Sequence, residues 1–345
     1  MNKKFNTLQI VRALAAILVI FHHITNHYNQ FNIPIWQSLK NGFCGVDFFF
    51  ILSGFVIAYT GTKHIRHPNK WFFFMGKRLS RIYIIYWIFL LIPITIIFLT
   101  APQFIKNPEI FKSLDIFKTI FLFFGHPVIS QVTWSLSHEI YFYFIFSLLI
   151  LSKKFNILIA VILFGTVLNT ITLILNINFI HSDLLSNGIF NPLNLEFLMG
   201  YSIFYLFKYF KGKRSIFILI SSLIIWSIIF SFFNVSLAFH VRLYTFGIPI
   251  FLIILSLVSI ESKWNLKYPN ILVQLGESSF IIYLIHSPIL SFWDKNFVLK
   301  TSYSLITKYF LTGFGVLAIL GLSLFLHYFA EKPIYSALKS RIARV

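Results

Sequence analysis

The chain has 345 residues, of which 58% are hydrophobic, 19% aromatic and 11% charged, and 44 are phenylalanine. This composition excludes a soluble globular domain and predicts an all-α integral membrane protein. The formal net charge is +19, but Lys and Arg gather in short loops between apolar segments, which is typical of cytoplasmic loops beside anionic lipid. We therefore expect a lipid bilayer, and no nucleic acid, as the partner of this charge. The single cysteine, Cys44, excludes an internal disulfide and a thiolate metal cluster.

Ten apolar segments have the length and composition expected of transmembrane helices. They cover residues 7–28, 43–60, 80–100, 134–151, 155–176, 192–210, 215–233, 241–260, 277–294 and 304–329. A short apolar run at residues 116–124 is typical of a re-entrant or interfacial segment. No Pro- or Ser-rich linker and no internal repeat separates the segments. We therefore expect residues 1–345 to form a single membrane domain, one bundle of about ten helices, with no appended soluble domain.

Lys and Arg are distributed unequally between the two sides of this topology. With ten spans both termini share a side, and that side carries 20 of the 29 Lys and Arg, against 7 on the other. The positive-inside rule then makes both termini cytoplasmic. We expect a multi-pass protein of the cytoplasmic membrane whose first span runs outward.

The first predicted span contains two ionisable side chains in an otherwise apolar stretch. Arg12 and His23 are eleven residues apart, so at about 100° and 1.5 Å per residue they share one helix face about 16 Å apart. Ionisable groups inside a membrane cost on the order of 2.5–3.5 kcal/mol each on insertion scales, and they usually line a site or a pathway. The topology places Arg12 toward the cytoplasm and His23 toward the outside.

The remaining buried charges fall at two depths. Arg78 and Arg81 open the third span from the cytoplasmic side, three residues apart on one helix face. With Arg12 they predict a cationic site for a phosphate-bearing molecule, because guanidinium groups bind phosphate in a forked geometry. Near the outer side we expect a cluster around His23, made up of Asp47, Glu139, Glu196, Arg242 and His286. A histidine oriented by a carboxylate is the usual general base for a hydroxyl group. No metal-ligand spacing is present, so we expect no metal.

Six motifs follow one another in an order and spacing that are specific when taken together. They are Arg12 with His23, and residues 45–55, 78–83, 134–139, 283–286 and 331–333. In these motifs the chain resembles the acyltransferase 3 family of bacterial membrane O-acyltransferases, which includes O-antigen and other surface-polysaccharide O-acetylases. The resemblance implies transfer of an acyl group, commonly acetyl from cytoplasmic acetyl-CoA, to a hydroxyl of a lipid-linked or surface glycan. Some relatives append a soluble hydrolase-like domain.

Each of these residues has an expected role, based on the family resemblance and on its expected depth in the membrane. We expect His23 to be the catalytic base at the far end of a tunnel, with Asp47 or Glu139 holding its imidazole. Direct transfer and an acyl-histidine intermediate both fit this chemistry. The expected acyl-CoA ligands are Arg12, Arg78 and Arg81, and the expected substrate contacts are Glu196, Arg242 and His286. The competing function is a transporter or flippase of glycan intermediates that uses the same charges as a translocation path. Acceptor identity, acyl length and oligomeric state do not follow from the sequence.

Overall fold

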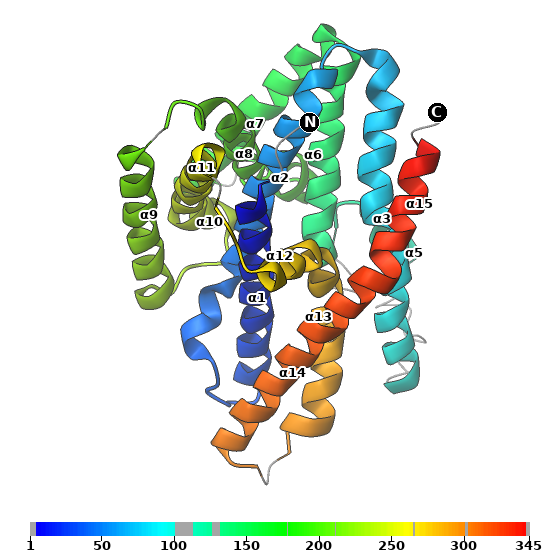
Figure 1. Ribbon diagram of the computed structural model, residues 1–345, viewed down its shortest axis with the longest axis vertical. Coiled ribbons are helices and arrows are strands. Elements are labelled where there is room, and N and C mark those ends of the chain that lie inside the picture. The colour runs from blue at the N-terminus through cyan, green and yellow to red at the C-terminus, as the bar shows by residue number, and fades with distance from the viewer. Residues whose placement is uncertain are drawn as a thin grey trace.

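The computed structural model describes residues 5–100, 113–125, 132–177, 179–210, 212–264, 266–300 and 303–342, and its regular structure in these ranges is helical. Figure 1 shows the helices gathered in one bundle. The α-helices are α1 (Asn6–Asn29), α2 (Gly45–Gly61), α3 (Trp71–Thr100), α5 (Ser113–Phe121), α6 (Thr133–Leu151), α7 (Asn156–Ile174), α8 (Asn194–Leu206), α9 (Lys213–Phe232), α10 (Phe239–Arg242), α11 (Ile248–Lys263), α12 (Asn270–Glu277), α13 (Ser279–Trp293), α14 (Leu305–Leu326) and α15 (Lys332–Ile342). Short 3-10 or π-helical segments join several of them, namely η1 (Gln37–Cys44), η2 (Thr62–His64), η3 (Pro68–Lys70), η4 (Lys153–Phe155), η5 (Leu184–Ile189), η6 (Leu243–Gly247), η7 (Asp294–Val298) and η8 (His327–Glu331).

Each of the ten predicted apolar segments contains a helix, so the predicted all-α membrane fold is confirmed. Within the described ranges, seven helical stretches are long and apolar enough to cross a membrane, and the pair α12–α13, bent by 68°, makes an eighth if it is one span. The two other predicted spans are α3, whose 30 residues include Lys77, Arg78 and Arg81 near its start, and α8. At 13 residues, α8 is about 20 Å long, which is shorter than a hydrocarbon core of about 30 Å. The count of ten spans therefore stays a prediction.

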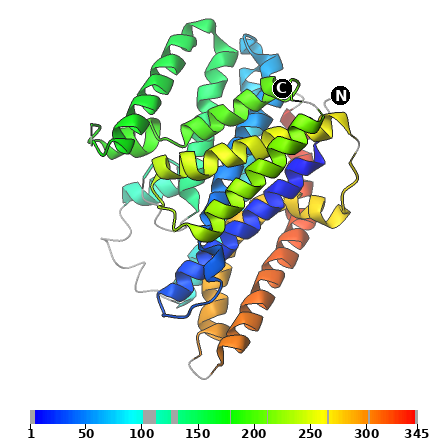
Figure 2. The ribbon, with the colours of Figure 1, turned by 90° about the vertical axis from the view of Figure 1, so that its left-hand side faces the viewer.

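The two ends of the described chain lie at the same end of the molecule. α1 begins and α15 ends in the upper part of Figure 1, whereas the hairpin between α13 and α14 forms the lower end. Figure 2 shows the same arrangement from the side, with α9 and α11 packed next to each other. This placement agrees with the expectation that both termini share one side of the membrane.

α1 is held at both ends by carboxylates from distant parts of the chain. At its beginning, Glu261 accepts hydrogen bonds from the backbone N–H groups of Asn6 at 2.8 Å and Thr7 at 3.0 Å. At its other end, the Tyr28 hydroxyl donates to Asp294 at 2.6 Å. The first N–H groups of a helix have no partner within the helix, and a negative charge there complements the helix dipole. The helix that carries Arg12 and His23 is thus fixed in place along its whole length.

Two glycines let neighbouring helices reach the backbone of α1. A Cβ atom at Gly45, where α2 begins, would lie 2.2 Å from the carbonyl oxygen of Ala15. A Cβ atom at Gly276 in α12 would lie 1.9 Å from the carbonyl oxygen of Gln9. Any other residue would push these helices away from α1, so the glycines bring α2 and α12 against the helix on either side of Arg12.

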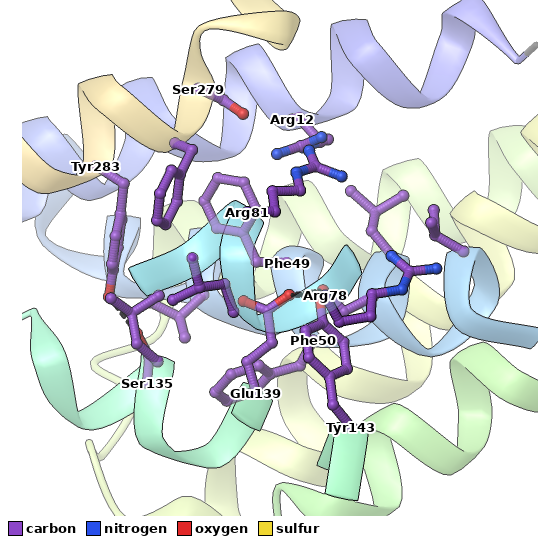
Figure 3. A pocket seen from close by; sticks show the side chains of 17 residues that line it. Arg12, Phe49, Phe50, Arg78, Arg81, Ser135, Glu139, Tyr143, Ser279 and Tyr283 are labelled. Carbon is purple, nitrogen blue, oxygen red and sulfur yellow. Dashed lines mark hydrogen bonds between the residues drawn. The ribbon is translucent and has the colours of Figure 1, made fainter. Parts of the chain in front are cut away.

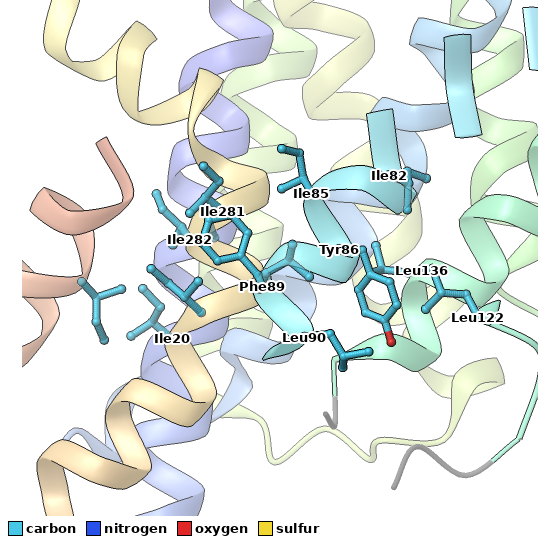
Figure 4. Packing of buried hydrophobic residues seen from close by; sticks show 14 of the residues in the cluster. Ile20, Ile82, Ile85, Tyr86, Phe89, Leu90, Leu122, Leu136, Ile281 and Ile282 are labelled. Atoms are coloured by element: carbon cyan, nitrogen blue, oxygen red, sulfur yellow. The ribbon is translucent and has the colours of Figure 1, made fainter. Parts of the chain in front are cut away.

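The largest hydrophobic cluster lies between α1, α3, α6 and α13. Figure 4 shows Ile20, Phe89, Leu136 and Ile281 from these four helices, packed together with other buried apolar side chains. Large apolar side chains also remain on the outside of the bundle, among them Phe217 of α9, which is 72% exposed. An apolar outer surface of this kind is what lipid requires.

The predicted re-entrant or interfacial run at residues 116–124 contributes most of α5, which ends against α3. The carbonyl oxygens of residues 119–121 accept hydrogen bonds of 2.6–2.9 Å from the side chains of Tyr86, Trp87 and Tyr83. The last carbonyl groups of a helix have no partner within it, and such groups are costly to leave unpaired in a membrane. The α3 aromatic side chains therefore supply partners for the end of a nine-residue helix.

Candidate active site

Three cavities follow one another through the bundle. We call them the inner, central and outer cavities, and their volumes are about 290, 80 and 760 Å³. Arg12 and Arg81 belong to the walls of both the inner and the central cavity. Val46 and Tyr283 belong to the walls of both the central and the outer cavity. The shared wall residues show that the three cavities are neighbours, with the central one between the other two.

The central cavity is lined by the three arginines that the sequence singled out: Arg12 from α1, and Arg78 and Arg81 from α3. Figure 3 shows them on one side of the cavity. Arg78 donates a hydrogen bond to the Thr60 hydroxyl, and its guanidinium lies 5.5 Å from the ring centroid of Tyr143. Among the described residues, none of the three arginines forms an ion pair with a carboxylate. Their positive charge is therefore available to an anionic ligand.

Glu139 lies in the central cavity with these arginines, not in the expected outer cluster around His23. The hydroxyl of Ser53 donates to its carboxylate at 2.9 Å, and the hydroxyl of Tyr143 donates to the same oxygen. Glu139 follows the start of α6 by six residues, or about 9 Å of helix, and this depth carries it to the level of the arginines. Figure 3 shows its carboxylate in the middle of the cavity.

His23 lies on the wall of the outer cavity, beyond the central one. Its imidazole packs against two other histidines, with ring centroids 5.5 Å away for His22 and 5.1 Å away for His286. Neither Asp47 nor Glu139 hydrogen-bonds to His23 within the described part of the chain. The expected carboxylate–histidine pair is therefore absent from this structure, because each carboxylate is engaged elsewhere.

Asp47 is engaged with Arg242 in a buried ion pair of 2.9 Å. The Arg242 guanidinium also lies between 5.2 and 5.9 Å from the ring centroids of Phe43, Trp134 and Phe239. Although Arg242 contributes to the wall of the outer cavity, its charge is compensated inside the protein. The structure therefore brings three of the predicted site residues together, Asp47, Arg242 and Glu196, but with each other and not with His23.

Two of the predicted substrate contacts are inaccessible from the three cavities. Glu196 and His286 are fully buried and contribute to none of the three walls. The carboxyl group of Glu196 lies beside that of Asp47. His286 lies behind His23, in contact with its ring. Their role as substrate contacts stays a prediction that this geometry does not support.

Both aromatic rings and polar groups line the wall of the outer cavity. The aromatic members are Phe43, Phe124, Trp134, Phe239 and Tyr283, and the polar members besides His23 and Arg242 are His22, Lys118, Ser137, His138, Asp183 and Asn187. A large concave site with a few polar groups is typical of small-molecule binding. Among the described residues no group of three or more His, Cys, Asp or Glu is placed to hold a metal.

The sequence analysis missed two side chains that hold Glu139. Tyr143 comes four residues after Glu139 on the same helix, so the i,i+4 rule already places the two side chains next to each other. Ser53 reaches Glu139 from another helix, 86 residues earlier in the chain. No sequence signal indicates this second contact, because it depends on how α2 and α6 are rotated against each other.

The comparison with protein families agrees with the fold and the cavities, which define a multi-pass membrane protein with a charged internal path. The acyltransferase 3 family model, described as an acyltransferase domain, matches residues 5–328. The chain therefore belongs to this family of membrane acyltransferases. Every predicted site residue lies within the matched range. Comparisons with curated proteins and with solved structures find no match.

Proposed function

We propose that the protein is an O-acetyltransferase of the cytoplasmic membrane. In this proposal it takes an acetyl group, or another acyl group, from cytoplasmic acyl-CoA and transfers it to a hydroxyl of a lipid-linked or surface glycan. The observation that carries the proposal is the series of three cavities, with His23 on one side. On the other side lie three arginines that form no ion pair with a carboxylate of the described residues. Such a series lets a donor and an acceptor approach the same bond from opposite sides of the bundle.

The arginines suit the donor because CoA carries several phosphate groups, which guanidinium groups bind strongly. The inner cavity, at about 290 Å³, has more room than the central one, at about 80 Å³. We place the nucleotide end in the inner cavity, with Arg12 and Arg81 at its boundary, and the slender thioester arm in the central cavity. The arm must cover roughly the 16 Å of helix that separate Arg12 from His23.

His23 suits the role of general base for the acceptor. In the proposed step the hydroxyl oxygen attacks the thioester carbonyl carbon while one imidazole nitrogen takes the hydroxyl proton. The carbon–sulfur bond breaks, the ester forms, and the imidazolium returns the proton to the leaving thiolate. The outer cavity provides aromatic rings against which sugar faces can pack, and Asp183 and Asn187 for hydrogen bonds to hydroxyls.

The first experiment is calorimetric binding of acetyl-CoA to the full-length protein in lipid nanodiscs. We expect micromolar affinity, and a loss of roughly 10- to 100-fold for each guanidinium removed in Arg78→Ala and Arg81→Ala, because a hydrogen bond to a charged group contributes about 1.5–3 kcal/mol. The control is Lys153→Ala, which removes an exposed cation between α6 and α7 and should bind as the wild type does. If neither acetyl-CoA nor a longer acyl-CoA binds to folded protein, the acyltransferase proposal fails and the transporter hypothesis takes its place.

The second experiment measures transfer from radiolabelled acetyl-CoA to glycolipid in membranes that express the protein. His23→Ala should reduce transfer by about 10²–10⁴-fold, the usual contribution of a general base, and leave acetyl-CoA affinity unchanged. His22→Ala tests the neighbouring ring, whose nitrogens contact Lys40 and Asn26. Transfer that persists in His23→Ala would show that another group takes the proton.

A further inference from the structure

His286 of α13 contains a buried nitrogen atom that the proposed reaction has not yet used. The residue is 0% exposed, and its Nε2 atom has no hydrogen-bond partner among the described residues. Leaving a buried polar atom unpaired costs about 1–3 kcal/mol. Such an atom beside a candidate catalytic residue therefore requires a physical explanation.

The other ring nitrogen of His286 fixes its chemical state. Nδ1 lies 3.1 Å from the backbone carbonyl oxygen of Ile282. A carbonyl oxygen only accepts hydrogen bonds, so Nδ1 carries the proton and donates it. A second proton would create a buried imidazolium that no carboxylate of the described residues contacts, at a large desolvation cost. The ring is therefore neutral, and Nε2 is a hydrogen-bond acceptor.

Two side chains with aromatic rings and polar groups pack against His286. Only one of them has a hydrogen-bond donor that is not already bound to another group. Tyr283, at 5.8 Å between ring centroids, has its hydroxyl within 2.6 Å of the Ser135 hydroxyl and 3.3 Å of the Val132 carbonyl oxygen. His23, at 5.1 Å, makes no hydrogen bond with the described residues. Rings at this separation can bring facing nitrogens to hydrogen-bonding distance.

Two histidines pack against His23, and only one of them has a ring nitrogen without a hydrogen bond. The second histidine against it, His22, donates from Nδ1 to the carbonyl oxygen of Lys40 at 2.7 Å. Its Nε2 accepts a hydrogen bond from the side-chain amide of Asn26 at 3.0 Å. Both nitrogens of His22 are occupied, whereas His286 offers His23 a free one.

We propose that His286 is a positioning residue that fixes the tautomer of His23. A rotation of the two rings within their contact lets the N–H group of His23 donate to Nε2 of His286, and the second nitrogen of His23 keeps its lone pair for the acceptor hydroxyl. His23 is then oriented by a neutral histidine, which is itself held by the backbone carbonyl of Ile282. A carboxylate commonly takes this orienting role beside a catalytic histidine. The ring contact and the unpaired Nε2 atom support the pairing, and its catalytic consequence rests on the proposed function.

Nuclear magnetic resonance of full-length protein labelled with ¹⁵N-histidine in lipid nanodiscs tests the pairing without any activity. In the wild type we expect one fixed tautomer for His23 and a scalar coupling across the hydrogen bond to Nε2 of His286. His286→Leu removes the acceptor and should let the His23 tautomers interconvert, whereas His286→Gln supplies an amide oxygen and should keep one tautomer. His181→Leu, in an exposed loop, is the control. A wild-type His23 without coupling to His286, and with the same tautomer exchange in His286→Leu, would overturn the pairing.

Transfer kinetics then separate positioning from a structural role. His286→Leu should reduce the rate of transfer about 100-fold, in line with the value of an oriented base, and keep acetyl-CoA affinity within twofold. His286→Gln should recover at least a tenth of the wild-type rate. An equal loss in both variants would mean that ring volume matters and hydrogen bonding does not. If His23→Ala retains transfer while the coupling is present, the proposed function fails and the histidine pair stands.

Discussion

Arginine occurs at two places in the interior of this protein, and its surroundings differ between them. In the central cavity, Arg12, Arg78 and Arg81 face open space and form no ion pair with a carboxylate of the described residues. Arg242 is 2% exposed, lies 2.9 Å from Asp47 and is surrounded by aromatic rings. Burial alone therefore does not make an arginine a ligand-binding residue. Its partners decide whether the charge holds the protein together or remains available to a substrate.

Breaking the Arg242 pair should give the largest effect on stability. Arg242→Met leaves the Asp47 carboxylate buried and uncompensated, which typically costs about 3–5 kcal/mol. Thermal unfolding in detergent should show a large drop in the midpoint temperature. The double variant Arg242→Met with Asp47→Leu removes both charges and should recover most of that loss. Equal midpoints for the single and the double variant would contradict the paired role.

Removing Arg12 should give an intermediate effect of a different kind. Arg12→Gln keeps a polar side chain at the boundary of the inner and central cavities and removes its positive charge. We expect acetyl-CoA affinity to fall about 10-fold, the equivalent of roughly 1.4 kcal/mol, with a change in unfolding midpoint much smaller than that of Arg242→Met. Calorimetry and thermal unfolding on the same sample compare the two quantities directly. A loss of stability without a loss of affinity would place Arg12 in the same class as Arg242.

Neutralising Glu139 should give the smallest effect on donor binding, and one of opposite sign. Glu139→Gln keeps an oxygen that accepts from Ser53 and Tyr143 and removes the carboxylate charge from the central cavity. Because that charge opposes an anionic ligand, acetyl-CoA should bind several-fold more tightly at low salt, and the gain should shrink as ionic strength rises. Titrations at two salt concentrations measure this difference. Weaker binding in the variant would indicate that Glu139 contacts the donor as a hydrogen-bond acceptor.

Much of the architecture could be predicted from the sequence because it depends on one helix at a time. The shared face of Arg12 and His23 follows from helical geometry, and the grouping of Arg12 with Arg78 and Arg81 follows from the direction of two spans. The apolar segments likewise identify the helices without reference to their neighbours.

What could not be predicted depends on contacts between helices. The sequence gives the depth of Glu139 only to within a few residues, and a single turn decides which cavity its side chain reaches. The pair between Asp47 and Arg242 joins residues 195 positions apart and requires the rotation of two helices. The burial of Glu196 and His286 depends on the same rotations, so the sequence could place them near His23 but could not exclude them from the cavity walls.

The attachment of α1 has a consequence for the order in which the protein is made. The ribosome makes this helix more than 200 residues before the two carboxylates that secure its ends, Glu261 and Asp294. During most of translation the segment with Arg12 and His23 lacks both anchors. Contacts with η1 and α2 are available early, whereas the hydrogen bonds at the two ends of α1 form only after residues 261 and 294 have been made. A chain that stops before residue 261 carries Arg12 and His23 but neither of these two carboxylates.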